Sequence, residues 1–242
     1  MRVATVVLAA GTSRRFGGRP KQFEALGDAT VLQHAVRAFA NNRRVAEIWV
    51  VTSAEHEATT RELLASEEVT GFVLGGATRA ASTIWALDSL DASVTHVLVH
   101  DAARPLLPRD TVERCLDALE VADVVATVVP PSDTVVVLDE AGEQVALMPD
   151  RDQVRLHQTP QGFRRDLLAD AWARLARTSP QVPFAAPDAA PPPTDDVTAV
   201  LRAFPDETVA WVDGDRRTMK VTHPDDLAVV RALADEGEAD PG

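Results

Sequence analysis

Lysine is nearly absent from this chain. Among its 242 residues, the 24 basic side chains include only two lysines, Lys21 and Lys220, and the remaining 22 are arginines. Lysine carries a compact charge on a flexible stem and arginine a planar fork, so the two do not replace each other at a crowded phosphate. A general drift towards arginine explains the scarcity, but not the place of Lys21 beside a glycine- and arginine-rich loop. We interpret the pair as a sign of triphosphate chemistry.

Cysteine and net positive charge are also scarce. Cys115 is the only cysteine, so no disulfide can form within the chain, and its place in a predicted helix indicates a buried, unreactive thiol. The formal net charge of −13 argues against nucleic acid or an anionic membrane as a partner, because either would need a basic face. A small anionic substrate needs only a few local cations and stays compatible with this charge.

No apolar run in the chain is long enough to cross a membrane. The run over residues 3–8 is short, and it lacks the cleavage pattern of a signal peptide. We therefore expect a cytoplasmic protein.

Apolar runs rich in β-branched residues alternate with amphipathic helical patterns along the first half of the chain. The pattern predicts strands at 3–8, 47–52, 71–74, 96–100 and 123–129, and helices at 31–40, 55–65, 78–90 and 109–119. Such alternation is typical of an α/β fold with three layers, α/β/α, around a mainly parallel, Rossmann-like sheet. Functional loops then belong at the carboxyl ends of the strands.

The pattern changes after Pro130. Two short strands, 134–138 and 144–148, predict a β-hairpin excursion over about residues 132–150. The remaining elements predicted are helices at 164–177, 195–203 and 224–234 and a strand at 208–212. A stretch over about residues 179–193 holds six prolines and predicts an extended surface loop. We expect one domain over residues 1–235 and a disordered tail over 236–242.

The loop after the first strand has the properties of a phosphate-binding loop. Residues 9–16 match neither G-x-x-x-x-G-K-[ST] nor G-x-G-x-x-G, which disfavours a P-loop NTPase and an ordinary dinucleotide fold. Gly11 permits a close approach to the backbone, while Arg14, Arg15 and Lys21 supply positive charge. The alternative, a solvated basic turn, is weakened by the buried strand that precedes the loop.

A second block, over residues 100–105, follows another apolar strand. Asp101 at the carboxyl end of that strand can hold Mg²⁺ or steer a triphosphate, and Arg104 can orient it. Asp101 could equally cap the following helix or pair with Arg104. These residues alone leave both interpretations open.

These blocks and several others, in a consistent order, resemble one enzyme family. The resemblance is carried by residues 8–11 with Arg14 and Arg15, 20–22, Gly75 and Gly76 with Arg79 and Ser82, 100–105, 158–163, 194–196 and 220–222. Over roughly residues 3–230 the chain is similar to the 2-C-methyl-D-erythritol 4-phosphate cytidylyltransferases of the non-mevalonate isoprenoid pathway. A match of this length argues against chance similarity.

The resemblance implies a nucleotidyltransferase fold with a CTP site built from these loops. The residues expected to be catalytic, at the phosphates of CTP, are Arg15, Lys21 and Lys220. The residues expected to bind the nucleotide are Ala10, Gly11, Gly76, Ser82, Asp101 and Ala102. Asp101 would also help to hold Mg²⁺, the expected cofactor, which would be bound mainly through the CTP phosphates.

The resemblance also implies an acceptor site and a homodimer. The hairpin excursion corresponds to the family's dimerisation arm. The residues expected to bind the acceptor, a polyol phosphate, are Arg104, Thr134, Arg151, Thr159 and Thr194, with Arg151 supplied by the neighbouring subunit. Some have a plainer alternative: Thr134 as a strand residue, Arg151 as surface charge, Thr159 as a brace for the turn at Pro160, and Thr194 as a helix cap.

The expected reaction is transfer of CMP from CTP to 2-C-methyl-D-erythritol 4-phosphate, with release of pyrophosphate. The nucleophile is a phosphate oxygen that is already an anion, so no general base is needed and catalysis reduces to positioning and charge stabilisation. The nearest alternative is a D-ribitol 5-phosphate cytidylyltransferase, because Ala86, Thr218 and residues 153–157 differ from the family pattern. Residues 132–134 and 159–163 favour the methylerythritol acceptor. A catalytically silent nucleotide-binding regulator is disfavoured because the cations of the site are retained.

Overall fold

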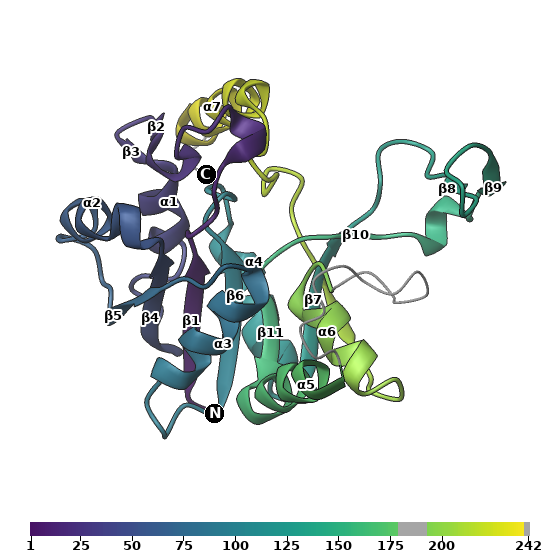
Figure 1. Ribbon diagram of the computed structural model, residues 1–242. Helices are drawn as coiled ribbons and strands as arrows, with labels where there is room; N and C mark the ends of the chain where they lie inside the picture. Colours follow the sequence, from purple (N-terminus) through teal and green to yellow (C-terminus); the bar gives the residue numbers. More distant parts are fainter. Residues whose placement is uncertain (179–192, 240–242) are drawn as a thin grey trace.

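A mixed β-sheet forms the centre of the protein, between two layers of helices. The computed structural model describes residues 1–178 and 193–239 (Figure 1). The strand order is β10-β7-β11-β6-β1-β4-β5, and β12 pairs with β7. These strands are β1 (Val3–Leu8), β4 (Val45–Thr52), β5 (Gly71–Leu74), β6 (His96–Asp101), β7 (Val124–Val129), β10 (Leu156–His157), β11 (Gln161–Arg164) and β12 (Ala210–Asp213). The expected three-layer α/β fold is confirmed.

The central strand β1 supplies both hydrophobic cores. It pairs in parallel with β4 and β6, and its side chains alternate, so that Val3 and Val7 join one core while Ala4 and Val6 join the other. Helices α1 and α4 cover the first core, and α3, α5 and α6 cover the second. The helices are α1 (Val31–Arg37), α2 (Glu57–Leu63), α3 (Arg79–Ser89), α4 (Arg109–Ala118), α5 (Arg165–Thr178), α6 (Asp196–Ala203) and α7 (Pro224–Ala239).

Two antiparallel strands interrupt the parallel pattern. β11 runs between β6 and β7, antiparallel to both, and β10 adds to β7 in the same sense. The sequence patterns do not predict β11, because its four residues include no β-branched side chain. The backbone of this strand packs closely on α4, since a Cβ at Gly162 would lie 3.0 Å from Cδ1 of Leu119, which follows that helix.

The hairpin excursion is a separate two-stranded sheet. β8 (Val137–Leu138) pairs antiparallel with β9 (Val145–Leu147), at a distance from the main sheet (Figure 1). Both strands are shorter than the sequence predicts. A role of this hairpin in dimer formation stays a prediction. Residues 179–192, most of the expected proline-rich loop, lie outside the described residues.

A third, smaller core joins the two ends of the chain. Phe16 and Leu26 from the amino-terminal part pack with Val221, Leu227 and Val230 from the carboxyl-terminal part. The short strand β2 (Ala25–Leu26), which pairs with β3 (Ala29–Thr30), therefore lies against α7 (Figure 1).

The last helix is longer than the sequence predicts. The segment expected to be a disordered tail from residue 236 is helical as far as Ala239, because α7 continues five residues past its expected end at Ala234. Across residues 1–178 and 193–239, no helix combines the length and the apolar character needed to cross a membrane.

Candidate functional site

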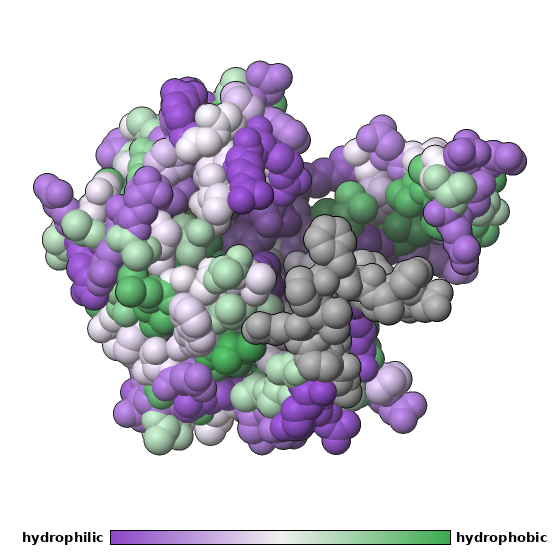
Figure 2. Space-filling view, in the orientation of Figure 1, coloured by the Kyte–Doolittle hydropathy of each residue, from purple (hydrophilic) through white to green (hydrophobic). Residues whose placement is uncertain are grey.

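Four segments meet at the carboxyl ends of β1, β5 and β6: the loops that follow these three strands and the segment 220–222. The first loop follows β1, Asp101 is the last residue of β6, and the segment 220–222 reaches the same edge, where Val221 N donates to the carbonyl oxygen of Ala103 at 2.8 Å. A hollow lined mostly by hydrophilic residues lies between the body of the protein and the hairpin excursion (Figure 2). This is the edge at which open α/β sheets bind ligands.

One side of the first loop is packed against the third core, and the other side is exposed. Ser13 adopts the left-handed conformation, with φ of 51°, and the side chain of Phe16 is buried in the third core. Arg15 is exposed, and no described atom lies within 4 Å of the position that a Cβ at Gly11 would take. The loop therefore presents backbone and a guanidinium to an approaching anion, as a phosphate-binding loop requires.

The two lysines come from opposite ends of the chain and meet here. Lys21 begins a short 3₁₀ turn, and its Nζ donates to the carbonyl oxygen of Val221 at 2.5 Å, beside Lys220. Burial, followed by repulsion from Lys220, lowers the pKa of Lys21 to about 8. Two ammonium groups held so close repel each other, and a polyanion between them would relieve that repulsion.

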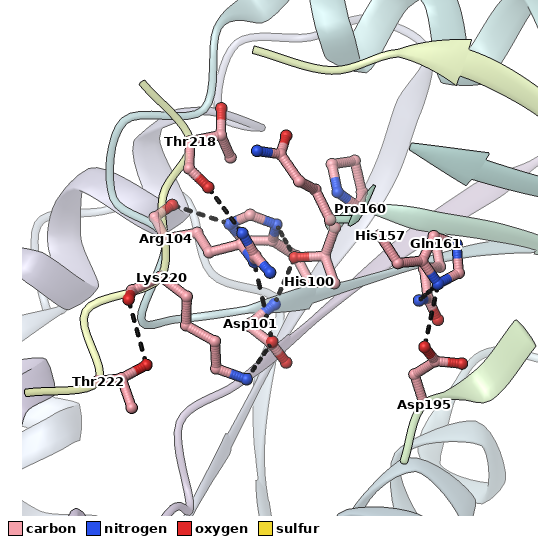
Figure 3. A network of polar contacts seen from close by, with 12 residues as sticks. His100, Asp101, Arg104, His157, Pro160, Gln161, Asp195, Thr218, Lys220 and Thr222 are labelled. Carbon is pink, nitrogen blue, oxygen red and sulfur yellow. Dashed lines mark hydrogen bonds and ion pairs between the residues drawn. The ribbon is translucent and has the colours of Figure 1, made fainter. Parts of the chain in front are cut away.

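Asp101 is the centre of the polar network (Figure 3). Its Oδ2 accepts from Nζ of Lys220 at 2.7 Å, and the guanidinium groups of Arg79 and Arg104 lie 3.6 and 4.0 Å from its carboxylate. Burial alone would raise the pKa of Asp101, but Lys220 and then Arg79 outweigh burial and hold that pKa well below its usual range. Asp101 is therefore ionised in a site with excess positive charge, and the alternative in which it caps the next helix is wrong, since the N-cap of α4 is Pro108.

A chain of hydrogen bonds fixes Asp101 from behind. The carbonyl oxygen of Arg104 can only accept, so His100 donates to it from Nε2 at 3.1 Å and its Nδ1 must accept from the hydroxyl of Thr159 at 2.9 Å. That hydroxyl in turn accepts from the backbone N–H of Asp101 at 3.1 Å. His100 is neutral, because burial lowers its pKa to about 4. Thr159 is buried, and its hydroxyl bonds the end of β6; the contact with the turn at Pro160 is made by the hydroxyl of Thr127 instead. A role of Thr159 in acceptor binding stays a prediction.

Arg104 is also turned towards the protein. Its Nη1 donates to the carbonyl oxygen of Thr218 at 2.8 Å, while its Nε is buried with no hydrogen-bond partner in the described chain. Ala102 is buried, and its backbone N–H donates to the carbonyl oxygen of Leu8 at 3.1 Å. Both residues lie at the site, where they connect the end of β6 to the segment at Thr218 and to the end of β1.

The expected nucleotide wall is assembled from small residues. The backbone N–H of Gly76 donates to Oγ of Ser82 at 3.1 Å. A Cβ at the neighbouring Gly75 would lie 2.3 Å from Cβ of Ala10, so the loops after β1 and β5 touch at this point. Ala10, Gly76 and Ser82 thus lie close together. Their role in binding the base and ribose stays a prediction.

The residues expected to bind the acceptor are only partly gathered. Thr134, near the start of the hairpin excursion, and Arg151, directly after it, are exposed, and the excursion extends away from the main sheet (Figure 1). Arg151 lines a pocket of about 320 Å³ whose other residues are Pro130, Pro131, Ser132, Asp152, Arg155 and Arg216. Thr194 is exposed and is not a helix cap, because Asp195 caps α6 by accepting from the backbone N–H of Thr198 at 2.8 Å.

Two contacts that tie α6 to the site are not predicted by any local sequence pattern. Nη1 of Arg79 lies 2.5 Å from Oδ2 of Asp196, and Oδ2 of Asp195 lies 3.0 Å from Nδ1 of His157 (Figure 3 shows the second pair). Arg79 and the pair at 195–196 both belong to the motifs that carry the family resemblance. Nothing local to either motif shows that they meet, because 117 positions separate Arg79 from Asp196.

A further pocket lies away from the lysines. It has a volume of about 490 Å³ and lies at the amino ends of β4 and β5, where it is lined by Phe39 and by residues 41–43, 45–48 and 68–70. It contains neither lysine nor Asp101, so we assign the chemistry to the cation cluster instead.

Comparison with known proteins shows the family of the chain. The profile of the 2-C-methyl-D-erythritol 4-phosphate cytidylyltransferase family matches residues 3–236. Enzymes of that name from Thermobifida fusca and Salinibacter ruber are 41% and 38% identical to the chain, and the alignments cover 98% and 96% of it and 95% and 92% of those proteins.

Solved structures are similar over the same length. The 4-diphosphocytidyl-2C-methyl-D-erythritol synthase of Anaerococcus prevotii superimposes with a TM-score of 0.82 at 25% identity, covering 97% of this chain and 96% of that one. The cytidylyltransferase of Thermus thermophilus superimposes with a TM-score of 0.73 at 34% identity, covering 97% and 100%. The resemblance drawn from the motifs is confirmed, and the chain belongs to the 2-C-methyl-D-erythritol 4-phosphate cytidylyltransferase family of enzymes.

Proposed function

We propose that this chain carries out, at the Lys21–Asp101–Lys220 cluster, the reaction for which its family is named. CMP passes from CTP to 2-C-methyl-D-erythritol 4-phosphate, giving 4-diphosphocytidyl-2-C-methyl-D-erythritol and pyrophosphate. The observation that carries the proposal is the meeting of the only two lysines, where Lys21 bonds the residue next to Lys220. Family membership supports the same conclusion.

The chain's own groups perform the reaction by positioning and charge. A phosphate oxygen of the acceptor attacks the α-phosphorus of CTP, the bond to the bridging oxygen breaks, and pyrophosphate leaves with its electron pair. Lys21 and Lys220 stabilise the charge that develops at the α-phosphate, and Arg15 holds the leaving phosphates. Ala10, Gly76 and Ser82 bind the base and ribose.

Mg²⁺ is the proposed cofactor. In residues 1–178 and 193–239, no group of three or more His, Cys, Asp or Glu side chains is arranged to hold a metal ion. Asp101 is the carboxylate that lies between Lys220 and Arg104. This set fits Mg²⁺, which commonly binds through one or two carboxylates together with substrate phosphates. Asp101 would be its protein ligand, and the ion would supply neutralising charge to the phosphates.

A homodimer with an exchanged arm is also proposed. Large apolar side chains are exposed along the hairpin excursion: Val136, Val137, Leu138, Val145, Leu147 and Met148. So much exposed apolar surface on a short excursion is typical of an interface. Contact with a second copy would cover it, and would also bring Thr134 and Arg151 towards the partner's lysines, where they would bind the acceptor phosphate.

The test is pyrophosphate release with CTP and Mg²⁺, comparing 2-C-methyl-D-erythritol 4-phosphate with D-ribitol 5-phosphate. We expect a strong preference for the methylerythritol acceptor in kcat/KM. A preference for ribitol 5-phosphate would leave the nucleotide site as described and replace the acceptor. Binding of CTP without pyrophosphate release on either acceptor would contradict the proposal.

A further inference from the structure

Arg79 lies between two carboxylates that belong to different parts of the fold. It is the first residue of α3, and its Nη1 is 2.5 Å from Asp196 at the start of α6, while its Nε is 3.6 Å from Asp101 at the end of β6. The Asp196 side chain is fully buried, and that of Asp101 is 12% exposed. One planar guanidinium thus spans the gap between the two aspartates, a geometry suited to arginine and not to lysine.

Asp196 is the fixed end of this arrangement. Its Oδ1 accepts from the indole N–H of Trp172 on α5 at 3.0 Å. Its backbone N–H donates to Oε1 of Gln161 on β11 at 3.2 Å. Trp172 belongs to the larger core, so Asp196 is held by packing as well as by hydrogen bonds.

Asp101, the other carboxylate, contacts the proposed catalytic lysine, Lys220. Lys220 reaches it at 2.7 Å, and the location of the Lys220 ammonium therefore depends on where the Asp101 carboxylate lies. Arg104, the other cation nearby, has its Nε 4.0 Å away and gives its Nη1 to the backbone of Thr218. Arg79 is thus the cation that ties Asp101 to a rigid part of the protein.

Arg79 is not optimised for stability. Its Nη2 is buried and has no hydrogen-bond partner in the described chain, and an unpaired buried N–H costs free energy. A purely structural arginine would be expected to satisfy this group.

We propose that Arg79 is a positioning residue that, anchored on Asp196, holds the Asp101 carboxylate where it receives the ammonium of Lys220. Arg79 acts through Asp101 and does not itself take part in bond making. The kinetic part of this proposal rests on the proposed function, and its structural part does not.

A double-mutant cycle tests the proposal. Arg79→Gln should lower kcat for CMP transfer on the order of 10–100-fold, the usual cost of removing the partner that orients a functional group. On an Asp101→Asn background the same substitution should change kcat less than about threefold, because the group that Arg79 positions is already gone. Equal factors on both backgrounds, or normal kcat in Arg79→Gln, would overturn the proposal.

A second measurement needs no activity. The chain has two lysines, so reductive ¹³C-methylation labels only these and the amino terminus, and the resonance of Lys220 is assigned with Lys220→Arg. Arg79→Gln should shift the Lys220 resonance relative to the wild type. The same substitution in the Asp101→Asn variant should change that resonance only slightly. If wild-type enzyme transferred no CMP, the proposed function would fail while this cycle still decided the role of Arg79. An unchanged Lys220 resonance in Arg79→Gln would refute the proposed positioning role of Arg79.

Arg37 provides a matched control. It also lies between two carboxylates, 2.9 Å from Glu67 and 3.6 Å from Asp28, but outside the site. Arg37→Gln should leave kcat and the Lys220 resonance unchanged. If Arg79→Gln does not fold, Arg79→Lys carries the same cycle, with a smaller loss expected because one ammonium cannot span both carboxylates.

Discussion

Lys21 donates from Nζ to the carbonyl oxygen of Val221 at 2.5 Å, and this bond brings the two lysines of the chain to one place. The third core supports it from below, because Phe16 and Val221 pack in the same cluster. The first loop and the carboxyl-terminal segment are therefore one unit. A change in either lysine should affect turnover and leave the fold intact.

Lys21→Ala and Lys220→Ala should each lower kcat on the order of 10²–10³-fold, the usual cost of removing one group that stabilises a transition state. Steady-state pyrophosphate release would measure the loss, and thermal unfolding would establish that both variants fold. Arg61→Ala is the control, since Arg61 forms an exposed ion pair with Glu57 within α2. Near-normal turnover in either lysine variant would remove that lysine from the mechanism.

Lys21→Arg and Lys220→Arg should not restore turnover. A guanidinium is wider than an ammonium and carries its charge in a planar fork, so it cannot take the place of the Lys21 ammonium at the carbonyl oxygen of Val221. The comparison with the alanine variants is made in the same assay. Full activity in both arginine variants would mean that a general drift towards arginine explains the scarcity of lysine, and that the site does not require lysine.

Lys21 should titrate near pH 8. Burial, followed by the charge of Lys220, lowers its pKa to about 8, so Lys21 is charged below that pH and neutral above it. In the free enzyme, kcat/KM for CTP should therefore fall as the pH rises through about 8. The unfolded chain keeps this proton up to its ordinary pKa of 10.5, so the contribution of Lys21 to stability rises with pH between those two values.

The ¹³C-methylated protein gives this titration directly. One dimethyl-lysine resonance should show a midpoint near 8, and Lys21→Arg should remove that resonance. A midpoint for Lys21 near its ordinary value of 10.5 would mean that the buried, like-charged environment described here does not exist in solution.

Two glycines of the site should respond differently to alanine. No described atom lies within 4 Å of a Cβ at Gly11, so Gly11→Ala should change stability by less than about 0.5 kcal/mol and raise KM for CTP, because the methyl group would meet the triphosphate. Gly75→Ala should instead destabilise the protein by roughly 1–3 kcal/mol, since its Cβ would lie 2.3 Å from Cβ of Ala10. Urea unfolding and CTP kinetics separate the two effects. An unchanged KM in Gly11→Ala would mean that the phosphates do not cross the loop there.

Local patterns were enough for two of the parallel strands. β1 and β5 have the predicted bounds, because short apolar runs between turn residues are typical of strands. The same reasoning failed for β11, whose four residues have no β-branched side chain and whose place is set by β6 and β7. Tertiary pairing decided that strand, and no local signal shows it.

The residues of the site also fall into those that local patterns predict and those that only the fold brings together. Lys21, Asp101 and Lys220 could be found because each lies in a short segment with a chemical pattern of its own. The contact of Arg79 with Asp196 could not, since each has a plausible local role and only the fold brings them together. Thr159 lies at the site as predicted, but its hydroxyl is used to brace Asp101, a detail that depends on the tautomer of His100.

Mixing two inactive variants should restore activity if the arm is exchanged between subunits. Arg151→Ala lacks the arginine offered by the arm, and Lys220→Ala lacks the lysine of the body. In a mixed dimer, one site combines the intact Lys220 of one subunit with the intact Arg151 of the partner. Random pairing of equal amounts should therefore give about a quarter of wild-type turnover, since about half of the dimers are mixed and each has one complete site.

An arm that serves the site of its own chain predicts a different result. If Arg151 served the Lys220 of its own chain, every site in the mixture would lack one of the two groups, and refolding the variants together would restore nothing. Arg151→Ala mixed with Lys21→Ala should complement equally well, because Lys21 belongs to the same body as Lys220. Lys21→Ala mixed with Lys220→Ala should not complement, because no site then holds both lysines. Recovery in the first two mixtures and none in the third would establish both the dimer and the exchange of the arm.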